Sequence, residues 1–262
     1  MSLQGWTLPL SPKGKAAALS PPPWYYSGEV LAIEFTLDPQ RVAAYLPSPL
    51  GVDPEGRALM LFCDWCSAAD NDPRLLADPG AGQYKEALIV LGATLDGKPV
   101  GRVPAIWVDN DTALVRGLVQ GFPKKLGTVE QTRAVNIGRG GVRKAVDSRF
   151  AGHVSAQGHR LVTASVNLEC AIQPQELPAL AMQPLVHTRL FPRLDSAEPA
   201  VNELFINHLT DIQIADVFAG NATLTFHESE YEELEGLGLK QVGRGYLFSL
   251  AYSLTGGEVV QA

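Results

Sequence analysis

Apolar residues along this chain gather in short runs separated by turn-forming residues. Runs such as ALIVLGATL, LVTASVNLE and YLFSLAYSL recur between Gly, Pro, Asn and Asp, and several of them alternate polar with apolar positions. Such alternation is typical of half-buried β-strands. The pattern therefore predicts a mainly β (α+β) protein with an antiparallel core.

Helical signals are fewer than strand signals. We expect helices over residues 39–45, 111–120 and 234–239. Residues 1–23 are rich in Pro, Gly and Ser and end in SPPP, which predicts an extended N-terminal arm. Since we find no internal repeat and no linker, we expect residues 24–262 to form a single domain.

Charge and hydropathy narrow the classes of partner. The chain of 262 residues has 21 basic and 28 acidic residues and a formal net charge of −7, so no broad positive field is available for nucleic acid or anionic lipid. No apolar stretch approaches the roughly 18 residues of a spanning helix, and the amino terminus lacks a basic segment followed by an apolar one. We expect a soluble, cytoplasmic protein without nucleic-acid or membrane partners.

Common metal, cofactor and nucleophile motifs are missing from the sequence. Cys63 and Cys66 form a CxxC, but no second ligand pair accompanies it, and the five histidines form neither HxxxH nor HExxH. The GxGxxG and GxSxG spacings are also absent. We therefore expect no metal and no cofactor.

The segment VQGFPKKLG, residues 119–127, offers a different chemistry. A lysine attacks a carbonyl only as the neutral amine, which at the ordinary pKa of about 10.4 is about one molecule in a few thousand at pH 7. An apolar wall or a neighbouring cation favours the neutral form. Here Phe122 and Leu126 flank Lys124 and Lys125, and each lysine adjoins the other.

Strand geometry separates these two effects. Consecutive side chains point to opposite faces of a strand, so Lys124 and Lys125 should not share one cavity, and we expect desolvation to matter more than repulsion between them. The alternative is a solvated lysine pair in a turn, because Pro123 and Gly127 are ordinary turn residues.

Residues 84–127, YKEALIVLGATLDGKPVGRVPAIWVDNDTALVRGLVQGFPKKLG, resemble the acetoacetate decarboxylase family, whose hallmark is PKKLG after a strand-turn-helix passage. The likeness continues through LPSPL at 46–50 and through residues 217–254, so it covers most of the chain. It implies a seven-stranded antiparallel β cone or barrel with peripheral strands and a few helices, in homo-oligomers. Acetoacetate decarboxylase is itself an established example of a lysine activated by desolvation or an adjacent cation.

The resemblance assigns roles by position. Lys124 is similar to the lysine that forms the Schiff base, Lys125 to its neighbour, and Glu86 to an active-site glutamate. Two departures concern the decarboxylases' charged pair: an ungapped count from LPSPL places Gly28 where they have an arginine and Met60 where they have a second glutamate. By that count the chain keeps the amine and lacks the pair that frames a β-keto acid.

The family also includes enzymes that run pyruvate through aldol condensation and dehydration, in which a tyrosine and a glutamine near the Schiff base matter. Tyr84 and Gln120 are the corresponding candidates for substrate binding. Tyr252, which alternates with apolar neighbours, is a candidate catalytic residue. The alternatives are a capping or surface amide for Gln120, and a core residue with its hydroxyl bonded to backbone for Tyr252.

These observations predict a Schiff-base carbon–carbon lyase that acts on a small keto acid, with preference for pyruvate condensation and dehydration with an aldehyde. One alternative is a true β-keto acid decarboxylase. Another, from a different class, is a non-catalytic β barrel that binds a small apolar ligand.

Overall fold

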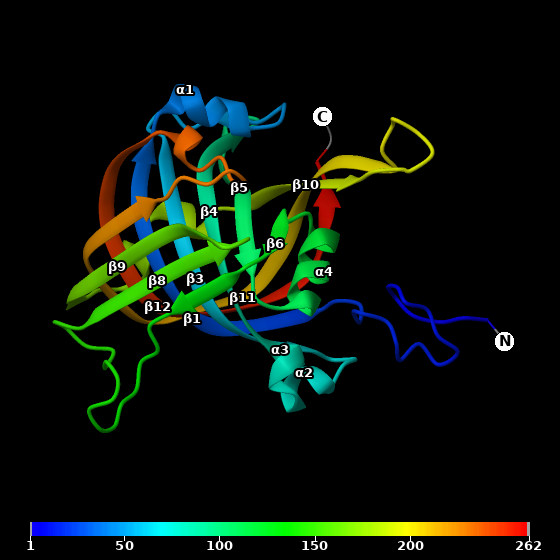
Figure 1. The fold of residues 1–262 in the computed structure, drawn as a ribbon, viewed down its shortest axis with the longest axis horizontal. Helices are drawn as coiled ribbons and strands as arrows, with labels where there is room; N and C mark the ends of the chain where they lie inside the picture. The colour runs from blue at the N-terminus through cyan, green and yellow to red at the C-terminus, as the bar shows by residue number, and fades with distance from the viewer. Residues whose placement is uncertain (1, 261–262) are drawn as a thin grey trace.

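The computed structural model describes residues 2–260 and consists mainly of β-strands (Figure 1). The strands of the described part are β1 (Trp24–Leu37), β2 (Gly51–Val52), β3 (Arg57–Ala69), β4 (Gln83–Leu95), β5 (Lys98–Val108), β6 (Lys124–Leu126), β7 (Thr128–Gln131), β8 (Arg149–Ala156), β9 (His159–Ala171), β10 (Leu185–Phe191), β11 (Val201–Phe226) and β12 (Leu239–Val259). The α-helices are α1 (Pro39–Val42), α2 (Arg74–Ala77), α3 (Pro79–Gly82) and α4 (Asp111–Gln120). No helix in residues 2–260 is long and apolar enough to cross a membrane.

Seven strands close into a ring. Their order is β10-β5-β4-β3-β1-β12-β11, and β11 pairs back with β10. This confirms the predicted seven-stranded barrel with peripheral strands. Within the ring, one pairing differs from the antiparallel expectation, because β10 runs parallel to β5 through Leu185–Gly101 and Val186–Arg102. A parallel pair fits here because a long crossover separates the two strands in sequence.

The ring strands serve two cores with their two faces. On β1, Leu31, Ile33 and Phe35 pack outward, while Val30 and Ala32 face the ring interior. The outward side chains meet β7, β8 and β9, which continue the sheet from β11 and cross in front of the ring strands (Figure 1). The ring is thus braced from outside, and its interior is left to form a cavity.

The helical predictions are partly confirmed. Residues 39–45 form α1 followed by a 3₁₀ turn, and residues 111–120 form α4, but residues 234–239 contain only the 3₁₀ turn Glu235–Leu237. The 3₁₀ turn after α1 is Ala43–Tyr45, and two further 3₁₀ segments, Pro174–Glu176 and Ala179–Met182, complete the described helices.

The turn after α4 depends on two glycines. The Asn110 side chain accepts from the Ala113 amide at 2.9 Å and starts the helix, and Gly121 ends it at a φ of +91°. A Cβ at Gly121 would lie 2.8 Å from the His187 Cβ, and one at Gly117 would collide with the Lys124 side chain. The chain can therefore double back so that Lys124 crosses the face of α4.

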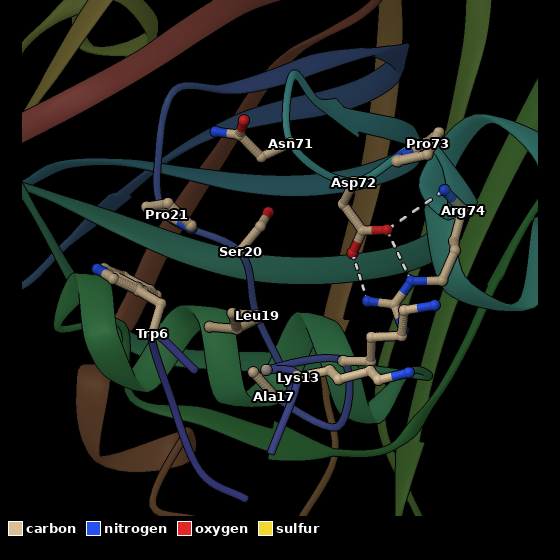
Figure 2. A pocket seen from close by; sticks show the side chains of 12 residues that line it. Trp6, Lys13, Ala17, Leu19, Ser20, Pro21, Asn71, Asp72, Pro73 and Arg74 are labelled. Atoms are coloured by element: carbon tan, nitrogen blue, oxygen red, sulfur yellow. Dashed lines mark hydrogen bonds and ion pairs between the residues drawn. The ribbon is translucent and has the colours of Figure 1, made fainter. Parts of the chain in front are cut away.

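The described part of the N-terminal arm, residues 2–23, is irregular and runs away from the ring (Figure 1). Leu19 is buried in the core, and the Trp6 ring meets Trp24 edge-on with centroids 5.7 Å apart. Figure 2 shows the hollow between this arm and residues 71–74, where Asp72 and Arg74 form an ion pair.

Candidate active site

A cavity of about 540 Å³ occupies the ring interior. Inward side chains of β1, β3, β4, β10, β11 and β12 line it, together with Gln120 and Phe122 at the end of α4. Most of the lining is apolar. Glu86 is the only carboxylate in the described lining, and no lysine or arginine is among these wall residues.

Lys124 and Glu86 form a buried ion pair at the wall of this cavity. β6 pairs in parallel with β5, and Lys124 lies opposite Ile106, whose side chain faces inward. The Lys124 Nζ is 2.8 Å from the Glu86 Oε2, and the two side chains are only 6% and 10% exposed. The Trp65 Nε1 donates to the other oxygen of Glu86 at 2.9 Å. The Glu86 carboxylate thus accepts hydrogen bonds from both the Lys124 amine and the Trp65 indole.

Aromatic rings surround this amine. The Lys124 Nζ is 5.4 Å from the centroid of the Tyr84 ring and 5.6 Å from that of Phe122. Proton transfer along the bond from Lys124 to Glu86 would produce a neutral amine in an apolar setting. Tyr84 is buried beside the pair and does not line the cavity itself.

The structure does not bring Lys125 to this site. Lys125 lies opposite Trp107, whose side chain packs outward. The Lys125 Nζ binds the Glu232 Oε2 at 2.8 Å, and the Lys125 side chain is 55% exposed. The Trp107 Nε1 donates to the same glutamate at 3.1 Å. Alternation along β6 is the physical reason, and it also separates the two lysines as predicted.

Gln120 and Tyr252 belong to a polar aromatic group at one end of the cavity. Gln120 is buried and lines the cavity, and its Nε2 lies 3.2 Å from the Tyr26 hydroxyl. The Tyr26 ring stacks on that of Tyr252 at 4.9 Å, and the Trp65 ring meets both edge-on. Gln120 is therefore neither a surface amide nor a helix cap.

Burial raises the pKa of Tyr252 and of Tyr84 well above the usual phenol value, and the negative charge of Glu86 adds to the effect. Both hydroxyls remain protonated at neutral pH. Tyr252 lines the cavity and can donate a proton or a hydrogen bond there.

Sequence reasoning missed Arg116, which lies one helical turn before Gln120 on the same face of α4. Arg116 is buried, and its guanidinium lies 5.4 Å from the Trp24 ring and 5.7 Å from the Tyr26 ring. Its Nε and Nη1 have no hydrogen-bond partner among the described residues. Its four-residue spacing from Gln120 places it on the same helix face, but nothing in the sequence marks that face as buried.

His187 was also missed. It is fully buried, lines the cavity, and has no partner for either ring nitrogen in residues 2–260. Its ring centroid lies 3.9 Å from that of Phe122. Burial, aided by the positive charges of Arg102 and Lys124, lowers the pKa of His187 to about 3, so the imidazole is neutral. No motif surrounds this residue, so nothing in the sequence marks it.

The two departures from the decarboxylase pattern have different outcomes. Gly28 faces the interior opposite Trp65, and a Cβ there would lie 2.6 Å from the Trp65 ring, so the indole occupies the space of a side chain. Met60 is buried on the outward face of β3. The ungapped count therefore assigned the decarboxylases' second pocket glutamate to the wrong position, because the inward positions on either side of Met60 are Leu59 and Leu61.

Ligands for a metal do not gather in the described structure. Cys63 is buried and Cys66 is exposed, since they lie on opposite faces of β3, and no group of three His, Cys, Asp or Glu side chains within residues 2–260 is placed to hold a metal ion.

Comparison with known proteins gives a consistent assignment. Residues 7–262 match the family described as acetoacetate decarboxylase (ADC). The structure of the enduracididine biosynthesis enzyme MppR complexed with pyruvate has a TM-score of 0.92 and 36% identity, covering 100% of this chain and 99% of that one.

A second MppR structure, complexed with the condensation product of pyruvate and imidazole 4-carboxaldehyde, has the same TM-score of 0.92 and 36% identity, over 99% of this chain and 97% of that one. Acetoacetate decarboxylase of Ralstonia nicotianae is 26% identical over 250 residues, which are 93% of this chain and 90% of that relative. From the ring fold, the buried lysine–glutamate pair and these matches, the chain belongs to the acetoacetate decarboxylase family.

Proposed function

We propose that this protein is a Schiff-base lyase that condenses pyruvate with an aldehyde and eliminates water. The observation that carries the proposal is the buried ion pair between Lys124 and Glu86, and Glu86 is the only carboxylate that lines the cavity in the described structure. MppR, with 36% identity, supports it, since its structures hold pyruvate and a pyruvate–aldehyde condensation product.

The first half of the reaction uses this pair. Lys124 passes its proton to Glu86, and the neutral amine adds to the keto carbon of pyruvate and loses water to form an iminium. The iminium draws electrons from the adjacent methyl group, which loses a proton to give an enamine. Glu86 returns the first proton to the hydroxyl that leaves as water, and the carboxylate regenerated in this way then takes the methyl proton.

The second half joins the two carbon skeletons. The enamine carbon attacks the aldehyde carbon, the carbonyl π bond breaks, and the oxygen takes a proton to become a hydroxyl. Loss of that hydroxyl and of a neighbouring proton as water leaves a double bond, and hydrolysis of the iminium releases an unsaturated keto acid and free Lys124. Tyr252, a protonated phenol in the cavity wall, is the proton donor for the leaving hydroxyl.

The carboxylate of pyruvate is retained throughout, and the polar end of the cavity suits that requirement. Gln120 provides a buried amide in the cavity lining. Behind that lining, Tyr84 is a protonated phenol, and Arg116 is a guanidinium beside Tyr26 with two nitrogens that have no partner in residues 2–260. A fixed cation stabilises a carboxylate throughout a reaction in which the carboxylate keeps its charge. That stabilisation is lost when the carboxylate leaves as neutral CO₂. The sequence led us to expect neutral donors only, and Arg116 adds the charge from α4.

Borohydride trapping tests the proposal. Incubation with pyruvate and reduction should add one pyruvate-derived mass increment to the peptide containing Lys124, and pyruvate with an aldehyde should produce the ultraviolet absorbance of an unsaturated keto acid. Lys124→Arg should abolish both and leave the circular dichroism spectrum unchanged, because guanidinium is never neutral in proteins. An adduct that persists in Lys124→Arg would refute the assignment of Lys124, and no adduct with any keto acid would favour a binding protein.

Decarboxylation of a β-keto acid is the second candidate, because curated relatives at 26% and 23% identity are named acetoacetate decarboxylase. It shares the iminium and differs in losing CO₂. We expect little CO₂ from acetoacetate. Efficient release, together with no absorbance change across a panel of aldehydes, would reverse the choice.

A further inference from the structure

The cavity changes character along the strands that build it. The inward positions of β3 and β4 pair across the sheet, and their order is Trp65–Tyr84, Cys63–Glu86, Leu61–Leu88 and Leu59–Val90. Each step advances about 6.7 Å along a strand. The reactive pair thus stands in the middle, with polar aromatic groups on one side and about 13 Å of apolar wall on the other.

We call the second side the apolar half, defined by Leu59, Leu61, Leu88, Val90, Leu180 and Leu185, all of which line the cavity. A volume of about 540 Å³ falls in the range of about 300–1,000 Å³ found for sites of drug-sized ligands. Pyruvate bound with its carboxylate at the polar end does not reach these side chains. An apolar wall of this size favours a hydrocarbon group over water.

His187 is the buried polar side chain of the apolar half. Val186 lies opposite Arg102, which pairs in turn with Leu91, so the next residue, His187, is level with the Val90 end of the cavity. Its ring lies against Phe122, whose ring is 5.6 Å from the Lys124 Nζ. Both imidazole nitrogens lack partners in the described structure, and a buried polar group of this kind is costly unless a ligand satisfies it.

The groups that face His187 explain why it stays unsatisfied. The charged side chains that act on it are the cations Arg102 and Lys124, and neither accepts a hydrogen bond. Asn207, on the neighbouring strand β11, uses its amide on the Gln120 carbonyl at 3.4 Å. These groups therefore offer no acceptor to the imidazole N–H of His187.

We infer that the apolar half binds the second substrate, an aldehyde with a hydrocarbon body larger than a methyl group, and that the neutral His187 imidazole donates a hydrogen bond to its carbonyl oxygen. This inference rests on the proposed condensation and deepens it. As the enamine carbon attacks the aldehyde carbon, the π electrons move onto that oxygen. A positioned donor stabilises the charge there, and the oxygen leaves later as water.

Substrate comparison tests the class of aldehyde. With pyruvate fixed, kcat/KM for benzaldehyde and hexanal should exceed that for acetaldehyde by at least about tenfold, and benzaldehyde should exceed imidazole 4-carboxaldehyde, a polar ring of similar size. Leu61→Asn should reduce the benzaldehyde value about tenfold and reduce the acetaldehyde value by a smaller factor. Leu76→Asn, at an exposed position on α2, is the matched control and should change neither. Equal use of acetaldehyde and benzaldehyde by the unmodified protein would overturn the inference.

Substitution of His187 tests the hydrogen bond. His187→Phe should lower kcat about a hundredfold for every aldehyde while borohydride still traps pyruvate on Lys124. His187→Gln, which keeps an N–H donor, should recover part of the loss. Unchanged kcat in His187→Phe would refute the role of His187, and lost trapping in both variants would make its role structural.

A binding measurement separates this inference from the proposed reaction. Calorimetric titration with benzyl alcohol, an unreactive analogue, should give heat of binding that ethanol does not, and Leu61→Asn should weaken it. If pyruvate leaves no adduct but benzyl alcohol binds in this way, the reaction fails and the apolar site stands. If pyruvate is trapped and benzyl alcohol does not bind, the apolar site fails and the Schiff base stands.

Discussion

Two adjacent lysines have opposite environments because β6 turns consecutive side chains to opposite faces. Lys124 faces Glu86, which lines the cavity, and Lys125 faces Glu232 and solvent. The pair motif therefore does not work by mutual repulsion in one pocket. Under the proposed reaction, burial between aromatic rings and the carboxylate partner are the determinants of reactivity at Lys124.

Removing the outer charge tests this conclusion. Lys125→Met should leave pyruvate trapping intact and shift the pH profile of imine formation by less than about one pH unit. The reason is that the Lys125 charge lies on the opposite face of β6, where solvent and salt screen it from Lys124. Rates of trapping between pH 5 and 10 measure the shift. A displacement of about three units would mean that the neighbouring charge is the main influence after all.

Glu86 should matter far more than Lys125. Glu86→Gln keeps an oxygen for Trp65 but removes the base that takes the Lys124 proton, so imine formation should slow about 10²- to 10⁴-fold. Stopped-flow or quenched trapping gives the rate, and Glu232→Gln on the outer face is the matched control. A rate within threefold of the unmodified protein would contradict the assignment of Glu86 as the base.

At the scale of elements, α4 and the turn that follows it position three groups of the site. Arg116 and Gln120 lie on one face of the helix, and the turn at Gly121 returns the chain so that Lys124 crosses Gly117. The turn works only because Gly121 adopts a positive φ and comes close to His187. The segment from Gly117 to Lys124 thus contacts His187 at Gly121 and also positions the Lys124 amine.

Gly121→Ala should destabilise the protein more than a positive φ alone explains. The left-handed conformation costs alanine about 1–2 kcal/mol, and here its Cβ would also lie 2.8 Å from that of His187. Gly97→Ala is the control, because Gly97 has a φ of +76° with no atom within 4 Å of an added Cβ. Urea unfolding at neutral pH should show a larger loss for Gly121→Ala, and equal losses would mean that the turn yields without moving β10.

Sequence predicts elements best where local signals fix them. Residues 111–120 could be recognised as a helix, which the structure caps at Asn110 and ends at Gly121, whereas 234–239 lacked such signals and forms a single 3₁₀ turn. Ring closure could not be read from local pattern, because β10 meets β5 and β11 across long sequence separations. Resemblance to a family supplied the barrel, and alternation supplied the faces.

The site shows the same division. Lys124 and Glu86 could be found because a motif marks them, and Lys125 could be turned outward by alternation. Arg116 and His187 could not, because burial and missing hydrogen-bond partners are properties of the assembled ring. The misplacement of Met60 came from counting residues without knowing which face each one takes.

At the scale of the whole molecule, assembly into a homo-oligomer remains a prediction from the family resemblance. Light scattering at micromolar concentration should give a mass of at least twice 28.1 kDa, the mass of one chain. A mass that stays at one chain across the concentration range would contradict it.

Enclosure of a neutral histidine also makes the stability of the molecule depend on pH. The pKa of His187 is about 3 in the folded protein and about 6.5 when it is free in the unfolded chain. Between these values the unfolded chain binds a proton that the folded protein does not, so stability falls as pH drops below 6.5, by up to about 1.4 kcal/mol per pH unit. Above pH 6.5 both states are neutral and His187 contributes no slope.

Urea unfolding at pH 7.5, 6.0 and 5.0 measures this slope against His187→Phe, which has no proton to bind. Carboxylates that titrate in the same range act on both proteins, so the difference between the two curves isolates His187. The difference in unfolding free energy should move in favour of the phenylalanine variant by about 2 kcal/mol from pH 7.5 to 5.0. Parallel curves would show that His187 takes up its proton inside the ring, which requires an acceptor or water at the imidazole and would remove the unsatisfied donor on which aldehyde binding depends.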